Sequence, residues 1–252
     1  YFNDKQRHSV REAGRLAGLD VLRVLNEPTA AAIAYGFGKK LKECIAVYDL
    51  GGGTFDVSII NINGQTFDVI ATGGDTFLGG LDFDDKIMQH MLQEAADETG
   101  VDLSFDRDAV DLFRVSAESA KIALSSEEET TLIIEDLDSP DIPAGHVFEF
   151  IITRELLEDL TQDLVERTIT ACSRILSDVD MTVSQIDRFL VVGGQSRMPL
   201  VRREVTSFAN LPLSTDLDAD NGVAAGAAIM ADVLNTDGNS NKKPKLVLHD
   251  VL

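Results

Sequence analysis

Two hydrophobic periodicities alternate along the chain and predict its strands and helices. Short apolar runs bounded by turn residues are typical of strands, and they occupy residues 21–27, 44–50, 55–62, 66–74, 130–137, 146–153 and 186–194. A period near 3.6 residues predicts helices at residues 4–16 and 28–36, two within 82–125, and others at 154–178, 199–209 and 221–234. This mixture predicts an α/β protein.

Local signals mark several boundaries of these elements. Asn3 or Asp4 can cap the first helix, and Gly18 suits its end. Pro28 opens the next helix at a first-turn position, where its missing N–H costs little. Asn63-Gly64 predicts a tight hairpin turn. The polar stretch after the last helix is linker-like, yet it ends in the apolar segment "LVLHDVL" at 246–252.

Composition narrows the classes of partner. The 22 basic and 43 acidic residues give a net charge of −21, which argues against binding nucleic acid or an anionic membrane by general electrostatics. Cys44 and Cys172 suggest neither a disulfide framework nor a zinc site. No apolar run of about 18 residues and no leader is recognisable, so we expect a cytoplasmic protein. Because the chain starts without Met, we also expect it to be a fragment.

Glycine clusters at strand ends are the first candidate ligand sites. They comprise Gly51 to Gly53, Gly73-Gly74 with Gly79-Gly80, and Gly193-Gly194. Glycine lets backbone N–H groups approach a phosphate without a Cβ in the way, although each cluster alone is more often a turn or a close backbone contact. No Gly-Lys-Ser/Thr sequence is present, so none of them is a Walker A loop.

Charged side chains near these loops suggest a metal and a ligand face. Asp49 ends a strand beside the first loop and could hold Mg²⁺ directly or through water, with the Thr54 hydroxyl at the same mouth. Glu118, Lys121 and Ser125 share one helical face by their spacing. Taken alone, that spacing indicates a surface ion pair between Glu118 and Lys121.

Six collinear motifs identify a family resemblance that covers nearly all of residues 1–234. They are "YFNDKQR", "NEPTAAAIAYG", "VYDLGGGTFDVSI", "GGDTFLGGLDFD", "ESAKIALSS" and "VVGGQSRMP". Together they resemble the nucleotide-binding domain of DnaK-type heat-shock protein 70 chaperones. The resemblance implies the actin-like ATPase (ribonuclease H-like) fold, mostly its second lobe, with an inserted helix-plus-sheet subdomain.

The same resemblance implies a division of the chain. Residues 1–43 would be a remnant of the first lobe with a crossover helix, and residues 44–81 with 186–234 the nucleotide-binding core of the second lobe. Residues 82–185 would form the inserted subdomain and a long connecting helix, and residues 235–252 a linker with an apolar end.

Roles for individual residues follow from the resemblance only. ATP or ADP with Mg²⁺, and K⁺ as a further candidate ion, would be the cofactors. Catalysis would involve Glu27, Asp49 and Thr54, with Asp49 and, through water, Glu27 near the metal. Nucleotide contacts would come from Gly51, Gly52, Gly53, Thr54, Gly73, Gly74, Gly79, Gly80, Glu118, Lys121, Ile122, Ser125, Gly193, Gly194, Ser196, Arg197 and Asp220. Signalling between domains would use Arg7, Leu246, Val247 and Leu248.

The implied function is that of an ATP-dependent folding chaperone, in which hydrolysis controls a linked peptide-binding domain. Its partners would be that domain, a J-domain co-chaperone, a nucleotide-exchange factor and unfolded client peptides, with no nucleic acid or membrane. The departures from the pattern are Leu81 in place of Glu, Asp218-Ala219 in place of Asn-Pro, and His249 in place of an apolar residue.

Alternatives on the same fold are a sugar or carboxylate kinase, a filament protein and a non-hydrolysing fragment. The family's first glycine loop and first-lobe lysine are not recognisable in these residues. Because phosphoryl transfer depends on surrounding the transferred group with such contacts, we expect weak or no hydrolysis by this chain alone.

Overall fold

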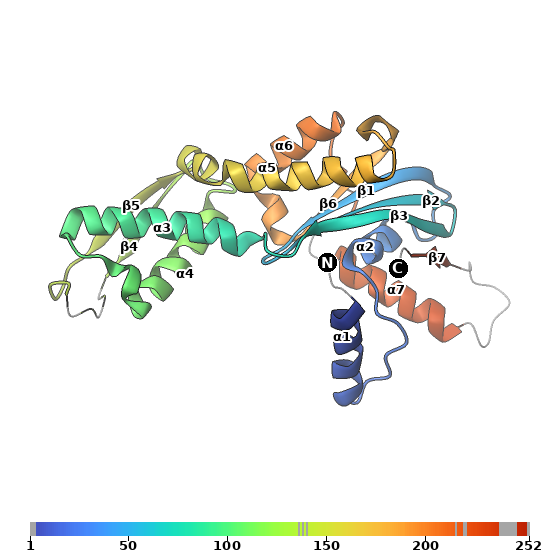
Figure 1. Cartoon of the computed structure of the whole chain (residues 1–252), viewed down its shortest axis with the longest axis horizontal. Coiled ribbons are helices and arrows are strands. Elements are labelled where there is room, and N and C mark those ends of the chain that lie inside the picture. The colour runs from blue at the N-terminus through green and yellow to red at the C-terminus, as the bar shows by residue number, and fades with distance from the viewer. Residues whose placement is uncertain are drawn as a thin grey trace.

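A mixed five-stranded sheet organises most of the chain (Figure 1). The computed structural model describes residues 4–135, 137, 139, 141–214, 216–218, 221–236 and 246–250. The strand order is β6-β1-β2-β3-β7, in which β1 and β3 pair antiparallel with β2, and β6 and β7 pair parallel with β1 and β3. The strands are β1 (Lys42–Leu50), β2 (Phe55–Asn63), β3 (Thr66–Asp75), β6 (Arg188–Val192) and β7 (Val247–His249).

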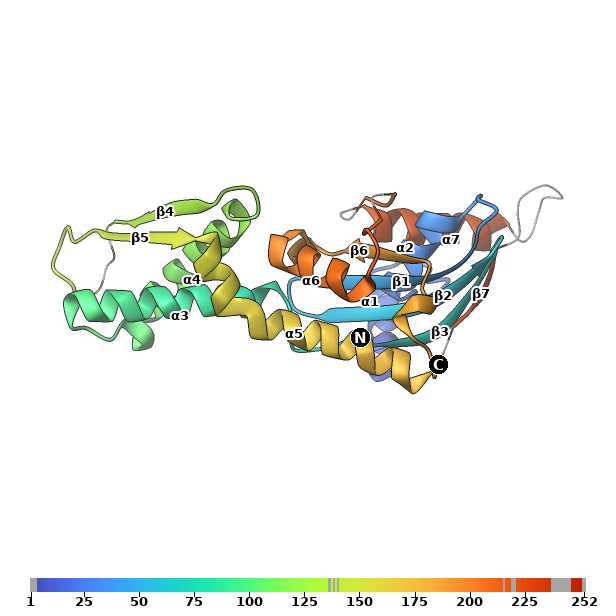
Figure 2. The same cartoon turned by 90° about the horizontal axis from the view of Figure 1, so that it is seen from above.

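Helices cover both faces of this sheet (Figures 1 and 2). One face packs against α5 (Arg154–Asp178) and α6 (Pro199–Ala209), and the other against α2 (Glu27–Gly36) and α7 (Gly222–Thr236). Along β1, Tyr48 and Leu50 join the first apolar cluster, whereas Ile45 and Val47 join the second. Because successive side chains of a strand point to opposite faces, a strand buried on both faces must be apolar almost throughout.

Small residues set the distance between α2 and α7. A Cβ added to Gly226 of α7 would lie 1.8 Å from the carbonyl oxygen of Ala30 in α2. No side chain fits that gap, so the two helices touch through their backbones. Packing therefore requires glycine at position 226 of α7, where the backbone of α2 comes closest.

A second body extends from the end of β3 (Figure 2). It contains α3 (Gly80–Thr99), α4 (Arg107–Ala123) and the antiparallel hairpin of β4 (Glu129–Ile134) and β5 (Phe148–Thr153). The rings of Phe148 and Phe150 both meet Phe113 of α4 edge-on, with centroids 5.9 and 5.5 Å apart. Ile133 and Ile151 face solvent, so this hairpin buries one face only.

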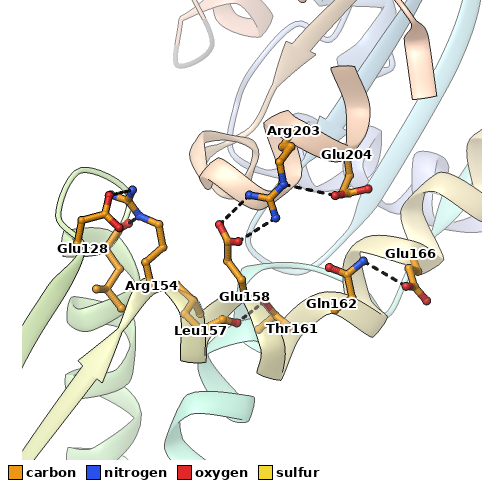
Figure 3. A network of polar contacts seen from close by, with 10 residues as sticks. Glu128, Arg154, Leu157, Glu158, Thr161, Gln162, Glu166, Arg203 and Glu204 are labelled. Carbon is orange, nitrogen blue, oxygen red and sulfur yellow. Dashed lines mark hydrogen bonds and ion pairs between the residues drawn. The ribbon is translucent and has the colours of Figure 1, made fainter. Parts of the chain in front are cut away.

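The long helix α5 joins the two bodies through a polar network (Figure 3). Arg154, its first residue, forms an ion pair with Glu128, and its Nε donates to the Leu124 carbonyl at the end of α4, 2.8 Å away. One turn further, Glu158 receives the guanidinium of Arg203 from α6 at 2.8 Å. The helix is therefore held at the outer body and at the sheet by charge-assisted hydrogen bonds.

The strand β7 extends the sheet at the β3 edge. It pairs Val247 with Thr66 and His249 with Asp68, while Leu246 is buried in the apolar cluster on the α2 face. His249 Nδ1 lies 2.5 Å from Asp68 Oδ1. The histidine that departs from the apolar pattern is therefore placed on a carboxylate instead of in the core.

Most predicted elements are confirmed, with short helical turns η1 (Leu103–Phe105), η2 (Val183–Gln185) and η3 (Gly194–Arg197) added between them. The strand predicted at 21–27 is wrong, because these residues form no ladder, and α1 (Asp4–Leu16) is followed by irregular chain up to α2. The hairpin turn falls on Gly64-Gln65, one residue later than predicted, because Asn63 still pairs with Thr66. Among the described helices, none is long and apolar enough to cross a membrane.

Candidate nucleotide site

The loop of residues 51–54 rests on the first turn of α3. The Gly51 N–H donates to the Thr54 carbonyl at 3.1 Å, which closes the loop between β1 and β2. The N–H groups of Gly80 and Leu81 donate to the carbonyls of Gly51 and Gly52 at 2.9 and 2.8 Å. These bonds use helix N-terminal donors that would otherwise lack partners, so the loop is fixed in one conformation.

Close backbone contacts explain the glycines that surround this loop. A Cβ on Gly79 would lie 2.4 Å from the Gly53 nitrogen, and one on Gly193 would lie 2.3 Å from the Leu50 carbonyl oxygen. Gly193 also has φ +86°, a conformation that glycine adopts without strain. Gly52 and Gly53, in contrast, have nothing within 4 Å of an added Cβ and are exposed. The tip of the loop is therefore open.

Three distant segments meet this loop at Gly80. The position of an ideal Cβ on Gly80 is 3.1 Å from Lys121 Nζ of α4, 3.3 Å from Gln195 Oε1 after β6, and 3.6 Å from Gly52 Cα. The missing side chain of Gly80 thus lets an ammonium, an amide and the glycine loop all pack closely around its backbone.

Carboxylates gather on the other side of the loop. Asp49 is 6% exposed, and burial, with added repulsion from Glu27 and Asp56, raises its pKa to about 7. Asp56 lies opposite Asp49 in the β1–β2 register and accepts a hydrogen bond from the Thr54 hydroxyl at 3.2 Å. No group of three His, Cys, Asp or Glu residues suited to a metal ion occurs within the described ranges.

Lys121 makes a buried ion pair that the sequence did not predict. Its Nζ lies 2.8 Å from Asp84 Oδ1 of α3 and donates to the Gly80 carbonyl at 3.1 Å. The predicted surface pair between Glu118 and Lys121 is wrong, because Lys121 is 9% exposed and turns toward α3, while Glu118 stays exposed. Burial raises the pKa of Asp84, and the Lys121 ammonium offsets part of that increase.

The remaining predicted nucleotide contacts vary in exposure. Ile122 is 63% exposed and Arg197 is also exposed, whereas Ser125 is half-buried. Ser196 is 2% exposed, and its hydroxyl donates to the Val192 carbonyl at 2.6 Å, which stabilises the turn after β6. Gly194 is exposed at the start of that turn.

Gly73 and Gly74 are explained by packing at the end of β3. A Cβ on Gly73 would lie 2.8 Å from Ile175 of α5, and one on Gly74 would lie 2.0 Å from the Phe55 carbonyl oxygen. Both residues line a cavity of about 640 Å³ between β3 and α5, together with Arg167. That cavity includes none of the loop residues 51–54.

A smaller cavity connects Arg7 with the acidic side of the loop. It measures about 380 Å³ and is lined by residues of α1 and the segment that precedes α2, with Arg7, Glu27, Thr54 and Asp56 among them. Leu246, Val247 and Leu248 lie at the β3 edge of the sheet. Asp220 lies outside the described residues.

The sequence reasoning missed three residues of this site. Asp56 follows the loop at the position that pairs with Asp49, so the predicted hairpin itself contained the signal. Asp84 lies one helical turn after Gly80, but only the packing of α3 against α4 shows its partner. Gln195 lies in a motif that was used for its glycines, Ser196 and Arg197, and its place beside Gly80 depends on the fold.

A family model described as Hsp70 protein matches residues 1–252. The chain belongs to the Hsp70 family. It is 45% identical over 240 residues to the chaperone protein DnaK of Carsonella ruddii (strain PV), a match that covers 93% of this chain. It spans 40% of the length of that relative.

Family membership fixes the fold class. Hsp70 proteins have the actin-like ATPase fold, and the mixed sheet covered by helices on both faces agrees with it. Chaperones of this family are ATPases that bind ATP or ADP, generally with Mg²⁺. The kinase alternative is not favoured by this match.

Proposed function

We propose that this chain is the second-lobe part of the nucleotide-binding domain of an ATP-dependent chaperone, and that its glycine loop binds the phosphate end of ATP or ADP. The observation that carries the proposal is the meeting of the loop, the start of α3, Lys121 and Gln195 around Gly80. Gly52 and Gly53 are open at the loop tip, where backbone N–H groups can approach phosphate oxygens.

The acidic side of the loop offers the hard oxygen donors that Mg²⁺ prefers, and phosphate oxygens would complete the ligand set, because the described side chains form no group of three that could hold a metal by themselves. Asp49 and Asp56 supply carboxylate oxygens, and the Glu27 carboxylate is close enough to help raise the pKa of Asp49. We propose that Asp49 holds the metal and that Glu27 contacts it through water, with K⁺ as a second ion. When bound, Mg²⁺ would neutralise and orient the phosphates, and its charge would oppose the burial that is the main cause of the raised pKa of Asp49.

The nucleoside would lie beside the end of α4. Glu118, Lys121, Ile122 and Ser125 would contact ribose and adenine from this helix. Gly193, Gly194 and Arg197 would contact the adenosine from the turn after β6, a turn that Ser196 supports through its bond to Val192. Gly73, Gly74, Gly79 and Gly80 support the site through backbone packing.

Control of a linked peptide-binding domain belongs to the proposal for the parent protein. Arg7 lines the same cavity as Glu27, and β7 occupies the sheet edge, so both could report the state of the nucleotide site. A J-domain co-chaperone, a nucleotide-exchange factor and unfolded polypeptides would be the partners, in the cytoplasm. The division of the chain at residues 43, 81, 185 and 234 is part of this proposal.

Gly53→Ala tests the phosphate loop with little disturbance of the fold. Its Cβ meets nothing within 4 Å, and Gly53 does not have a positive φ, so the melting temperature should stay unchanged. A methyl group at the loop tip should block the close approach of phosphate. We expect calorimetric titration to show at least about tenfold weaker binding of Mg·ADP, the loss of roughly one strong hydrogen bond.

Adenosine serves as the ligand control. The variant should bind it as the wild type does, because adenosine has no phosphate. Unchanged Mg·ADP affinity in a folded Gly53→Ala variant would contradict the assignment of the loop. No detectable binding by the wild-type chain would contradict nucleotide binding by these residues alone. Hydrolysis would then have to be measured with the full-length parent.

A further inference from the structure

Asp84 and Lys121 form the most deeply buried ion pair at the candidate site. Asp84 is 2% exposed and Lys121 is 9% exposed, and their charged atoms are 2.8 Å apart. Lys121 also donates to the Gly80 carbonyl, one helical turn before Asp84. Both partners of the ammonium therefore belong to the first turns of α3, although Lys121 itself belongs to α4.

This arrangement fixes where the ammonium can act. A lysine ammonium has three N–H donors, and two directions are already used, toward Asp84 and toward Gly80. Nζ also lies close to Gly80, where Gly52 of the glycine loop and Gln195 approach as well. The remaining donor is thereby available next to the glycine loop.

Neighbouring carboxylates of α3 have other partners. Asp82 accepts a hydrogen bond from the Gly79 N–H at 2.8 Å, and Asp85 pairs with Arg114 at 3.1 Å. Leu81 is apolar and 58% exposed. Asp84 Oδ1 has no hydrogen-bond partner among the described residues apart from its charge contact with Lys121. Asp84 therefore depends on Lys121 for its charge partner, and Asp84 is the one carboxylate of this turn that holds the Lys121 ammonium beside the Gly80 carbonyl.

We propose that Asp84 is a positioning residue for nucleotide binding, which holds Lys121 Nζ in one place beside the glycine loop. The inference rests on the proposed function. A free lysine side chain samples many rotamers, and fixing it beforehand removes that entropy loss from the binding step. Asp84 touches no ligand in this scheme and acts only through Lys121.

Charge-matched variants of the whole chain test the proposal by calorimetric titration with Mg·ADP. Asp84→Asn and Asp85→Asn remove the same charge from the same helix, but only the first removes the partner of Lys121. We expect Asp84→Asn to weaken binding roughly five- to tenfold, about the effect of losing one ordinary hydrogen bond. Asp85→Asn should stay within about twofold of the wild type.

A double-mutant comparison separates positioning from general damage. In a Lys121→Met background, Asp84→Asn should have no further effect on affinity for Mg·ADP, because the ammonium that Asp84 holds in place is absent. A structural role would instead lower affinity by the same factor in both backgrounds. Melting temperatures are measured for every variant.

An apolar replacement covers the case in which a single variant fails to fold. Asp84→Leu combined with Lys121→Met exchanges the pair for packed side chains, a change that buried ion pairs often tolerate. This double variant should fold and bind Mg·ADP as weakly as Lys121→Met.

The outcomes distinguish the two proposals. Wild-type affinity in folded Asp84→Asn, or equal losses in both backgrounds, would overturn the positioning role and leave the proposed function intact. Failure of the wild-type chain to bind Mg·ADP would contradict the proposed function for this chain, and the positioning role with it.

Discussion

The central sheet and the outer hairpin bury apolar residues by different rules. The sheet is covered on both faces, so β1 and β2 are nearly continuous runs of buried residues. The β4–β5 hairpin packs one face on α4 and leaves the other to water, so buried and exposed residues alternate along β5. The number of covered faces therefore determines whether the buried residues of a strand are continuous or alternate with exposed ones.

The outer hairpin and one face of the sheet nevertheless share a single apolar cluster. Phe113 and Phe148 of the outer body belong to the same cluster as Tyr48 of the sheet, through residues of α3 and α5. The second cluster, beneath α2 and α7, lies on the other face. We therefore expect the outer body and the α5 face to unfold together.

Phe148→Ala should have the largest effect. The ring is fully buried between Phe113 and Phe150, and its loss should lower the free energy of unfolding by about 4 kcal/mol, as expected for a cavity in a packed core. Urea denaturation followed by circular dichroism measures the change. Ile151→Ala, on the exposed face of the same strand, should change stability by under about 1 kcal/mol. Similar losses for the two variants would show that the hairpin is not packed on one face only.

Gly226→Val disturbs the second apolar cluster, beneath α2 and α7, and should cause the second-largest loss of stability. The new side chain would collide with the Ala30 carbonyl and force α7 away from α2, at a cost of about 3 kcal/mol. Ala225→Val places the same side chain on the exposed part of α7 and should cost well under about 1 kcal/mol. Equal melting temperatures for the two variants would contradict direct backbone contact between the helices.

Arg154→Met tests the junction between the two regions. It removes the bonds to the carbonyls of Leu124, which caps α4, and of Glu127, in the turn before β4, and should cost about 2 kcal/mol. Arg174→Met is the control on the same helix, because Arg174 is largely exposed and should cost under about 0.5 kcal/mol. Hydrogen exchange should show the outer body opening more often in Arg154→Met; unchanged exchange there would contradict the anchoring role.

His249→Ala should have the smallest effect. The exposed pair with Asp68 contributes little to global stability, but its loss should let β7 open about twofold more often. Exchange of the Val247 amide, which donates to the Gln65 carbonyl, reports that opening. Asp68→Asn should give the same change, and equal protection in all three proteins would mean that burial of Leu246 alone holds the strand.

Much of the fold was predictable because its signals are local. The 3.6-residue period placed α5, and Pro28 placed the start of α2. Residues 21–27 carried a strand-like apolar pattern, yet they lack a neighbouring strand, and a strand forms only where its backbone groups find a ladder. The apolar pattern of a segment does not show whether a neighbouring strand is available to pair with it.

The candidate site was predictable to a different degree. The glycine loop and Asp49 were recognisable from the order of residues, and six motifs implied the family that the comparison confirmed. Lys121 was placed on the right helix but given the wrong partner, since its spacing to Glu118 fits a surface pair equally well. The identity of its true partner depends on how α3 crosses α4.

Periodicity, turn chemistry and motif order were enough to predict most elements, the loop and the family, because these signals lie in neighbouring residues. Tertiary structure alone decided that Gly80 borders Lys121, Gln195 and Gly52, and that Asp84 neutralises Lys121 in the interior. The physical reason is desolvation: a charge buried by packing must find a partner in the same place, and only the folded chain fixes which residues share that place.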